Sequence, residues 1–131
     1  GLQRGSTIAH IARAALESVA FQTAELLAAM AKDGVAPQRL RVDGGMARND
    51  WLMQFMADIL GIEALRPRNT ETTVLGAAIL AAVGAGEFSS LNEAAALWKL
   101  DRKFEPDMAP DDRARQLSGW QKAIARVKTS A

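Results

Sequence analysis

The sequence has no cysteine and a single histidine, His10, among its 131 residues. Without cysteine the chain forms no disulfide and has no thiol for catalysis or for zinc. A lone histidine within a helical pattern is more often structural than catalytic or metal-binding, so we expect His10 to be structural. The longest apolar run, residues 74–85, is shorter than the roughly 20 residues that cross a bilayer, and no signal peptide is evident. We therefore expect a cytoplasmic protein without membrane insertion.

The chain also lacks a strong excess of charge of either sign. It has 16 basic and 15 acidic residues, a net charge of +1, which gives no support for a nucleic-acid or membrane-surface role. Hydrophobic residues make up 49% of the sequence, but many of them are alanine, which favours closely packed helices. The length predicts one domain, residues 1–131, that buries roughly two-thirds of its unfolded surface.

The sequence is most informative at residues 40–50. A short apolar run ends at Asp43, Gly44 and Gly45 follow, and a helical pattern begins after Asn49, which can cap it. Two glycines allow positive φ and leave no Cβ between the backbone and a ligand. Amides at a helix start suit an anion or a nucleotide. Most such turns only connect two elements, so the residues alone leave both interpretations open.

Apolar spacing and capping residues predict helices over residues 7–32, 49–60, 74–83 and 90–98 and from residue 110, and strands over residues 39–43 and 62–66. Residues 99–109 are charged, contain Pro106 and are expected to be irregular. The helix at 74–83 is apolar all round, so we expect both its faces to be covered. Gly76 within it indicates a close neighbour, either another backbone or a ligand.

This alternation of helices and strands predicts an α/β fold with parallel strands and right-handed crossovers. Two strands do not make a covered parallel sheet, so the chain has the pattern of the second half of an α/β domain. The start of the sequence, residues 1–6, has no initiator methionine and leads almost directly into a helix. We therefore expect a piece of a longer protein.

Several short motifs support a family resemblance. They are Val42-Asp43-Gly44-Gly45-Met46, Asn49-Asp50, Leu52-Met53-Gln54-Phe55, Ala57-Asp58-Ile59-Leu60-Gly61, Arg66-Pro67, Glu71-Thr72-Thr73 and Leu75-Gly76-Ala77-Ala78. Together with residues 10–17, they resemble the C-terminal domain of the glycerol kinases, which are carbohydrate kinases of the actin-like, ribonuclease-H-like ATPase fold. The resemblance weakens after Gly84. Sibling sugar kinases more often have a third glycine and a serine where this chain has Met46 and Asn49, which favours glycerol as the substrate.

The resemblance implies an adenosine-binding site. In glycerol kinases the second glycine of this turn lies against the nucleotide and the asparagine four residues later lies near the adenine. These roles transfer to Gly45 and Asn49, with Gly44 allowing the turn. A cap-only role for Asn49 stays open, and both roles can hold at once. Residues 71–78 are expected to support the site by packing.

The family's catalytic base, phosphate loops, metal-binding carboxylate and glycerol pocket would all lie upstream of this chain. Asp43, Asp50 and Asp58 match no catalytic motif, so we expect no catalytic and no metal-binding residue here. The implied cofactors are ATP and Mg²⁺, with the metal ligands outside the chain.

Two functions remain open at this stage. The chain is either the ATP-binding portion of a glycerol kinase, inactive by itself, or a non-catalytic actin-like nucleotide-binding or assembly module. The expected partners are ATP or ADP, glycerol, the N-terminal part of the same protein and further copies in a homo-oligomer.

Overall fold

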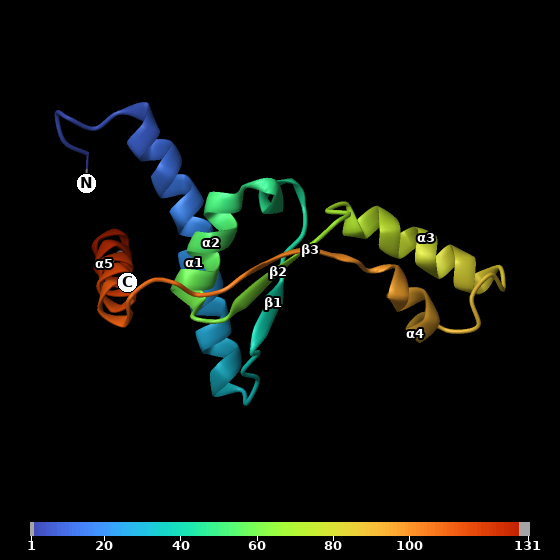
Figure 1. Cartoon of the computed structure of the whole chain (residues 1–131). Helices are drawn as coiled ribbons and strands as arrows, with labels where there is room; N and C mark the ends of the chain where they lie inside the picture. Colours follow the sequence, from blue (N-terminus) through green and yellow to red (C-terminus); the bar gives the residue numbers. More distant parts are fainter. Residues whose placement is uncertain (1, 129–131) are drawn as a thin grey trace.

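The computed structural model describes residues 2–128 and shows a small mixed sheet packed against helices, with an arm of two helices extending away from it (Figure 1). The helices are α1 (Ile8–Lys32), α2 (Asp50–Leu60), α3 (Thr72–Gly84), α4 (Leu91–Ala94) and α5 (Pro110–Val127), with two short 3-10 helices, η1 (Gly45–Arg48) and η2 (Ala95–Leu97). The strands are β1 (Arg39–Arg41), β2 (Glu63–Pro67) and β3 (Leu100–Phe104).

The sheet has the order β1-β2-β3, with β2 in the centre. β1 and β2 are parallel, as the alternating pattern predicted, and Leu40 lies opposite Ala64. β3 is antiparallel to β2, and Phe104 lies opposite Ala64 on the other side. The expectation that residues 99–109 are irregular was therefore wrong for residues 100–104.

The pattern of β3 explains why hydropathy did not reveal it. Of its five residues only Phe104 is buried. Besides its backbone pairing with β2, the strand makes ion pairs that join Asp101 to Arg66, Arg102 to Asp50 and Lys103 to Glu63. An exposed, charged edge strand lacks the alternation of apolar and polar residues that identifies a half-buried strand.

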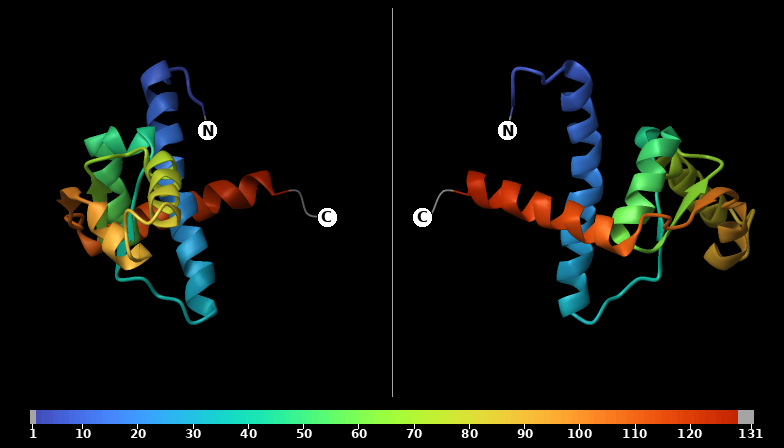
Figure 2. Two further views of the ribbon diagram at one scale, coloured as in Figure 1. Left: turned by 90° about the vertical axis from the view of Figure 1, so that its right-hand side faces the viewer. Right: turned by 60° about the vertical axis from the view of Figure 1, so that its left-hand side comes forward.

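The main core lies between α1, α2 and α5. The ring of Phe21 meets that of Phe55 edge-on, with centroids 5.7 Å apart, and stacks on Trp120 at 5.2 Å. A second cluster, between α2 and the sheet, contains Ala47, Met53, Ala57, Ala64 and Phe104. Because Ala47 belongs to η1, this cluster ties the segment before α2 to the sheet. Figure 2 shows α1 and α5 crossing beside this core.

The ends of the first two helices agree with the prediction, whereas the helix predicted over residues 90–98 is a short α4 that continues as the 3-10 helix η2. α1 ends at Lys32, and Gly34 after it has φ 85°. Gly61 closes α2 in the left-handed conformation, with φ 68°. His10 has a structural role in this chain, since its Nδ1 accepts a hydrogen bond from Thr7 N at 3.2 Å at the start of α1.

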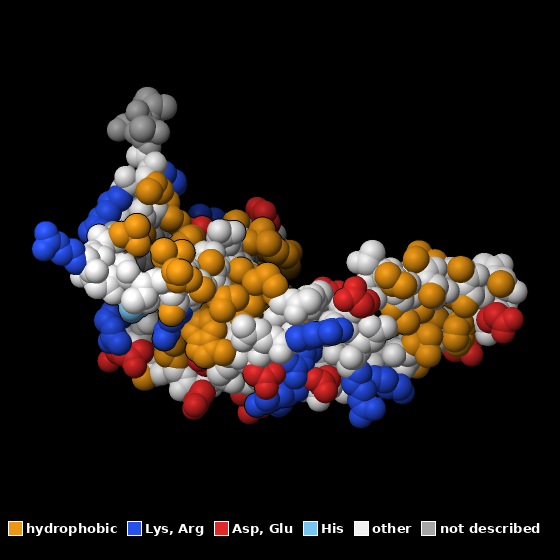
Figure 3. Space-filling model, turned by 90° about the horizontal axis from the view of Figure 1, so that it is seen from above, with side chains coloured by type: hydrophobic (Ala, Val, Ile, Leu, Met, Phe, Trp, Pro, Cys, Tyr) orange, Lys and Arg blue, Asp and Glu red, His pale blue; other side chains and the backbone are white. Residues whose placement is uncertain are grey.

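The expectation for α3 was wrong within this chain. No residue of α3 is buried, and Val74 and Leu80 are 69% and 62% exposed. A Cβ added at Gly76 would have no atom within 4 Å among the described residues, so the close neighbour inferred from this glycine is not among them. Figure 3 shows apolar side chains along the arm that α3 and α4 form. The covering surface that an apolar helix needs is therefore not supplied by residues 2–128.

Candidate functional site

The glycine turn follows β1, at the edge where both parallel strands end. Gly44 has φ 83° and ψ 173°, a conformation that favours glycine, so its predicted role in the turn is confirmed. Its amide donates to Thr70 O at 2.8 Å, and the amide of Val42 donates to Leu65 O at 2.9 Å. These two bonds fasten the turn to the end of β2 and to the segment that leads into α3.

A 3-10 turn, η1, begins at Gly45 and lies between Gly44 and the N-cap of α2. The helix begins after Asn49, as predicted, but the 3-10 turn before it was not predicted. Ala47 N donates to Gly44 O at 3.1 Å, Asn49 N donates to Met46 O at 3.1 Å, and the side chain of Ala47 is 1% exposed. Ala47 thus anchors the turn in the core, while Gly45 and Asn49 on either side of it are exposed.

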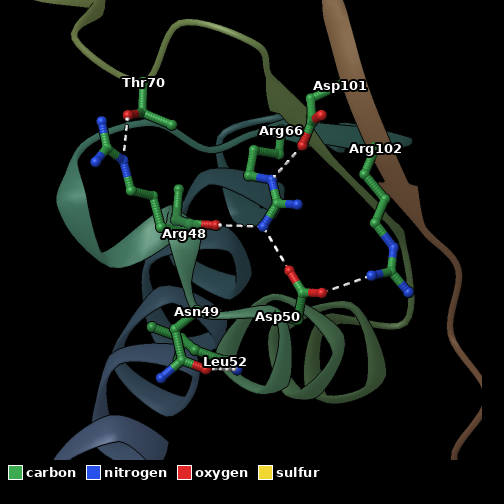
Figure 4. A network of polar contacts seen from close by, with 9 residues as sticks. Arg48, Asn49, Asp50, Leu52, Arg66, Thr70, Asp101 and Arg102 are labelled. Carbon is green, nitrogen blue, oxygen red and sulfur yellow. Dashed lines mark hydrogen bonds and ion pairs between the residues drawn. The ribbon is translucent and has the colours of Figure 1, made fainter.

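Asn49 is the N-cap of α2, as predicted. Its Oδ1 accepts a hydrogen bond from Leu52 N at 3.1 Å. Figure 4 shows the amide nitrogen of Asn49 turned away from this bond. The cap therefore uses the oxygen and leaves the nitrogen as a donor for another group.

The backbone does not require glycine at position 45. Unlike Gly44, Gly45 has no positive φ, and a Cβ built on it would have no atom within 4 Å. The local fold thus explains the first glycine of the pair and leaves the second unexplained. A ligand lying against the backbone would explain it, because a side chain there would occupy the ligand's space.

An arginine on β2 links the turn, α2 and β3. Arg66 Nη1 donates to Ala47 O at 3.0 Å and to Asp50 Oδ1 at 2.6 Å, and its Nε donates to Asp101 Oδ2 at 2.7 Å (Figure 4). Arg102 Nη1 donates to the second oxygen of Asp50 at 2.6 Å. The hydrogen bond from Arg66 is the largest cause that lowers the pKa of Asp50 below its ordinary value of 3.8, and it also raises the pKa of Arg66.

The sequence reasoning missed this network. In the sequence, Asp50 and Arg66 stand out only as members of two short motifs, Asn49-Asp50 and Arg66-Pro67. The residues of this network come from elements up to 52 residues apart in the chain, so no local sequence spacing predicts their contacts.

Two shallow hollows flank the turn. One, of about 210 Å³, is lined by Arg41, Val42, Asp43, Pro67, Thr72 and Trp98. The other, of about 290 Å³, is lined by Arg48, Arg66, Pro67, Arg68, Thr70 and Asp101. Pockets for small molecules and cofactors usually measure about 300–1,000 Å³. Each hollow is thus smaller than a usual ligand pocket and is better suited to form one wall of a binding site.

Within the part of the chain that the structure describes, no group of three or more His, Cys, Asp and Glu side chains is placed to hold a metal ion. None of the helices in residues 2–128 is both long and apolar enough to cross a membrane.

Residues 1–85 match the model of the FGGY family of carbohydrate kinases, C-terminal domain. The chain is 54% identical over 129 residues to the glycerol kinase of Deinococcus radiodurans and 55% identical over 129 residues to that of Solidesulfovibrio magneticus. Each alignment covers 98% of this chain and 26% of the relative. The chain thus spans about a quarter of the length of these curated relatives.

Solved structures agree with the sequence relatives. Glycerol kinase of Plasmodium falciparum, a structure with ADP, superposes with a TM-score of 0.81 at 34% identity, covering 100% of this chain and 26% of that one. Xylulose kinase of Rhodospirillum rubrum gives a TM-score of 0.77 at 30% identity, covering 97% of this chain and 26% of that one.

Proposed function

The chain belongs to the FGGY family of carbohydrate kinases, as its C-terminal domain, and on that premise we propose that it is the nucleotide-binding portion of a glycerol kinase. The fold is the C-terminal part of the ribonuclease-H-like, actin-like ATPase domain expected from the sequence. The proposed reaction of the whole protein transfers the γ-phosphoryl group of ATP to a hydroxyl of glycerol, giving glycerol 3-phosphate.

One observation carries the choice of glycerol. Curated proteins named glycerol kinase are 54–55% identical to this chain over nearly its whole length, whereas the xylulose kinase of Rhodospirillum rubrum is 30% identical. The glycerol pocket, the catalytic base and the phosphate loops belong, in this proposal, to parts of the protein outside the chain.

The proposed nucleotide contacts are Gly45, against which adenosine lies, and Asn49, whose amide nitrogen is available to the adenine. Gly44 provides the turn. Support comes from the open space above Gly45 and from the cap geometry of Asn49, which occupies the oxygen and not the nitrogen. Support also comes from the relative of Plasmodium falciparum, whose structure was determined with ADP.

Mg²⁺ would accompany ATP and neutralise phosphate charge during transfer, held by carboxylates outside residues 2–128. The proposal further includes a cytoplasmic location, a single unit over residues 1–131 and assembly into a homo-oligomer. The alternative, a non-catalytic actin-like module, has no specific observation in its favour.

A coupled assay of ADP release tests the proposal. The full-length protein should turn over ATP in the presence of glycerol and should not use xylulose at a comparable rate. The 131-residue chain by itself should show no turnover. Glycerol-dependent ADP release by this chain alone, or preference of the full-length protein for a sugar, would contradict the assignment.

A further inference from the structure

We propose that Arg66 is a positioning residue for nucleotide binding, which fixes the turn bearing Gly45 and Asn49 in place by clamping both sides of it. This inference rests on the proposed nucleotide site. Arg66 would not touch the nucleotide, and it would act through the backbone that does.

The hydrogen bonds of the Arg66 guanidinium form the clamp. Nη1 donates to Ala47 O, in the last turn of η1, and to Asp50, the first residue of α2. These two acceptors enclose the dipeptide of Arg48 and Asn49. Nη1 of Arg66 therefore fixes η1 relative to the start of α2. Because Asn49 lies between the two bonded residues, these bonds also fix the direction in which its side-chain amide faces.

The other end of the clamp is rigid. Arg66 lies on the central strand β2, and its Nε bonds Asp101 of β3, so the side chain is held from the sheet. Its side chain is 13% exposed, and its Cζ lies 5.4 Å from the centre of the Phe104 ring. Its partners Asp50 and Asp101 are 54% and 43% exposed, so the defined geometry comes from bonds of one guanidinium to three acceptors and not from shielding.

Arginine suits this role and lysine does not. A guanidinium presents several N–H donors in a fixed plane, whereas an ammonium is a compact charge on a flexible stem. A lysine at position 66 would keep the positive charge near Asp50 and Asp101. It would not bond both carboxylates and the carbonyl of Ala47 in one plane.

Arg102 provides a matched control. It bonds the same carboxylate, Asp50, at the same distance of 2.6 Å as Arg66 does. Its side chain is 54% exposed, and no hydrogen bond joins it to Gly45–Arg48 within the described residues. A change at Arg102 therefore removes one arginine–Asp50 ion pair without removing the clamp.

The experiment compares Arg66→Lys with Arg102→Gln in the full-length kinase. Arg66→Lys should raise KM for ATP about tenfold, the effect of one lost charge-assisted hydrogen bond. KM for glycerol and kcat should change less than about twofold, and Arg102→Gln should leave all three constants within about twofold. A milder variant, Asp101→Ala, removes only the acceptor of Nε and should raise KM for ATP by a smaller factor.

Amide hydrogen exchange without nucleotide gives an independent readout. In Arg66→Lys the amides of residues 44–49 should exchange about tenfold faster, while amides in the middle of α2 keep the wild-type rate. Equal acceleration throughout α2, or a parallel loss in kcat and in both KM values, would mean general destabilisation and would overturn the inference.

The outcomes separate this inference from the proposed function. If Gly45→Val weakens ATP binding and Arg66→Lys does not, the assignment of Arg66 is wrong and the nucleotide site stands. If Gly45→Val leaves KM for ATP unchanged, the nucleotide site itself is wrong and the role of Arg66 falls with it.

Discussion

The guanidinium of Arg113, in α5, lies directly over Gly61, the residue that ends α2. A Cβ added to Gly61 would come within 2.9 Å of Arg113 Cζ. In this position Arg113 Nε donates to Ile59 O at 2.8 Å and Nη2 donates to Leu60 O at 2.9 Å. A cation thus satisfies carbonyls at the C-terminal end of α2, where the helix dipole favours positive charge.

Removing this cation should destabilise the chain. We expect Arg113→Met, which keeps the apolar stem, to lower the free energy of unfolding by about 2 kcal/mol, since two hydrogen bonds from a charged donor are lost. Arg115→Met is the control on the same helix. Arg115 pairs with Asp112 on an exposed surface, and no other ion pair joins it to residues 2–128, so its loss should cost less than about 0.5 kcal/mol. Urea unfolding followed by circular dichroism measures both, and equal effects would contradict the role given to Arg113.

Two glycine-to-alanine changes should have opposite effects on the free energy of unfolding. Gly61→Ala places a side chain at φ 68° and against Arg113, so it should destabilise by about 1–3 kcal/mol. Gly119 lies inside α5 with no atom within 4 Å of an added Cβ, so Gly119→Ala should stabilise by about 0.5–1 kcal/mol. Thermal melting of the two variants beside the wild type tests this, and a shift of both in the same direction would refute it.

The glycine pair allows ligand effects to be separated from fold effects. In the full-length protein Gly45→Val should raise KM for ATP strongly, leave KM for glycerol nearly unchanged and keep the melting temperature, because position 45 has ordinary backbone geometry and open space. Gly44→Val should lower the melting temperature, since φ 83° strains a branched residue. If the Gly45→Val enzyme is folded and has the wild-type KM for ATP, the glycine turn is not part of the nucleotide site.

Substitutions of Asn49 should separate its two roles. Asn49→Ala loses the cap, at about 1 kcal/mol, and any bond to adenine. Asn49→Asp keeps an oxygen for Leu52 N but replaces the amide nitrogen. We therefore expect Asn49→Asp to retain stability and to weaken ATP binding. If it binds ATP as the wild type does, Asn49 is a cap only.

Asp50 should make stability depend on pH in the acid range. Its pKa is lowered in the folded state, chiefly by the hydrogen bond from Arg66, so the unfolded chain binds the proton more readily. The stabilisation is present above the ordinary value of 3.8 and is lost as pH falls below it, through the lowered pKa. The stability advantage of wild type over Asp50→Asn should therefore shrink on acidification from pH 7 to pH 3. Parallel curves of unfolding free energy against pH would contradict this.

The exposed side of α3 should make the chain associate with further copies of itself. Val74 and Leu80 present apolar surface along the arm shown in Figure 3. Light scattering of the 131-residue chain should show oligomers, and the double change Val74→Gln and Leu80→Gln should reduce them. Val127→Gln, at a valine on α5 that is 80% exposed, is the control and should leave association unchanged. A monodisperse wild-type monomer would refute the prediction.

Helices and the parallel strand pair could be predicted because their signals are local. Asn49 and Gly61 bound α2 through backbone chemistry that acts within a few residues, and the structure places both where the sequence indicated. The same helix carries two polar side chains, Gln54 and Asp58, whose partners the sequence did not reveal. Asp58 Oδ1 accepts from Asp107 N at 2.8 Å, and Gln54 Nε2 donates to Glu105 O at 2.7 Å, so the two side chains hold the segment after β3.

The clamp at Arg66 could not be predicted in the same way. A charged side chain on a strand has no preferred partner until the tertiary fold brings carboxylates near it, and Asp50 and Asp101 lie 16 and 35 residues away. The same limit applies to Gly45, since a glycine required by its own backbone and a glycine required by a ligand look alike in a sequence. Only the backbone conformation distinguishes them, since Gly44 has a positive φ and Gly45 does not.

The antiparallel pairing of β2 with β3 constrains how the sheet is completed during synthesis. β2 ends at Pro67 and β3 begins at Leu100, so a growing chain carries the central strand with one open edge while the residues of α3 and α4 are being added. Translation that stops within this interval would release a product with exposed hydrogen-bonding groups and an apolar helix beside them. Such truncated chains should be substrates for chaperones and proteases, whereas adding five mostly charged residues closes that edge.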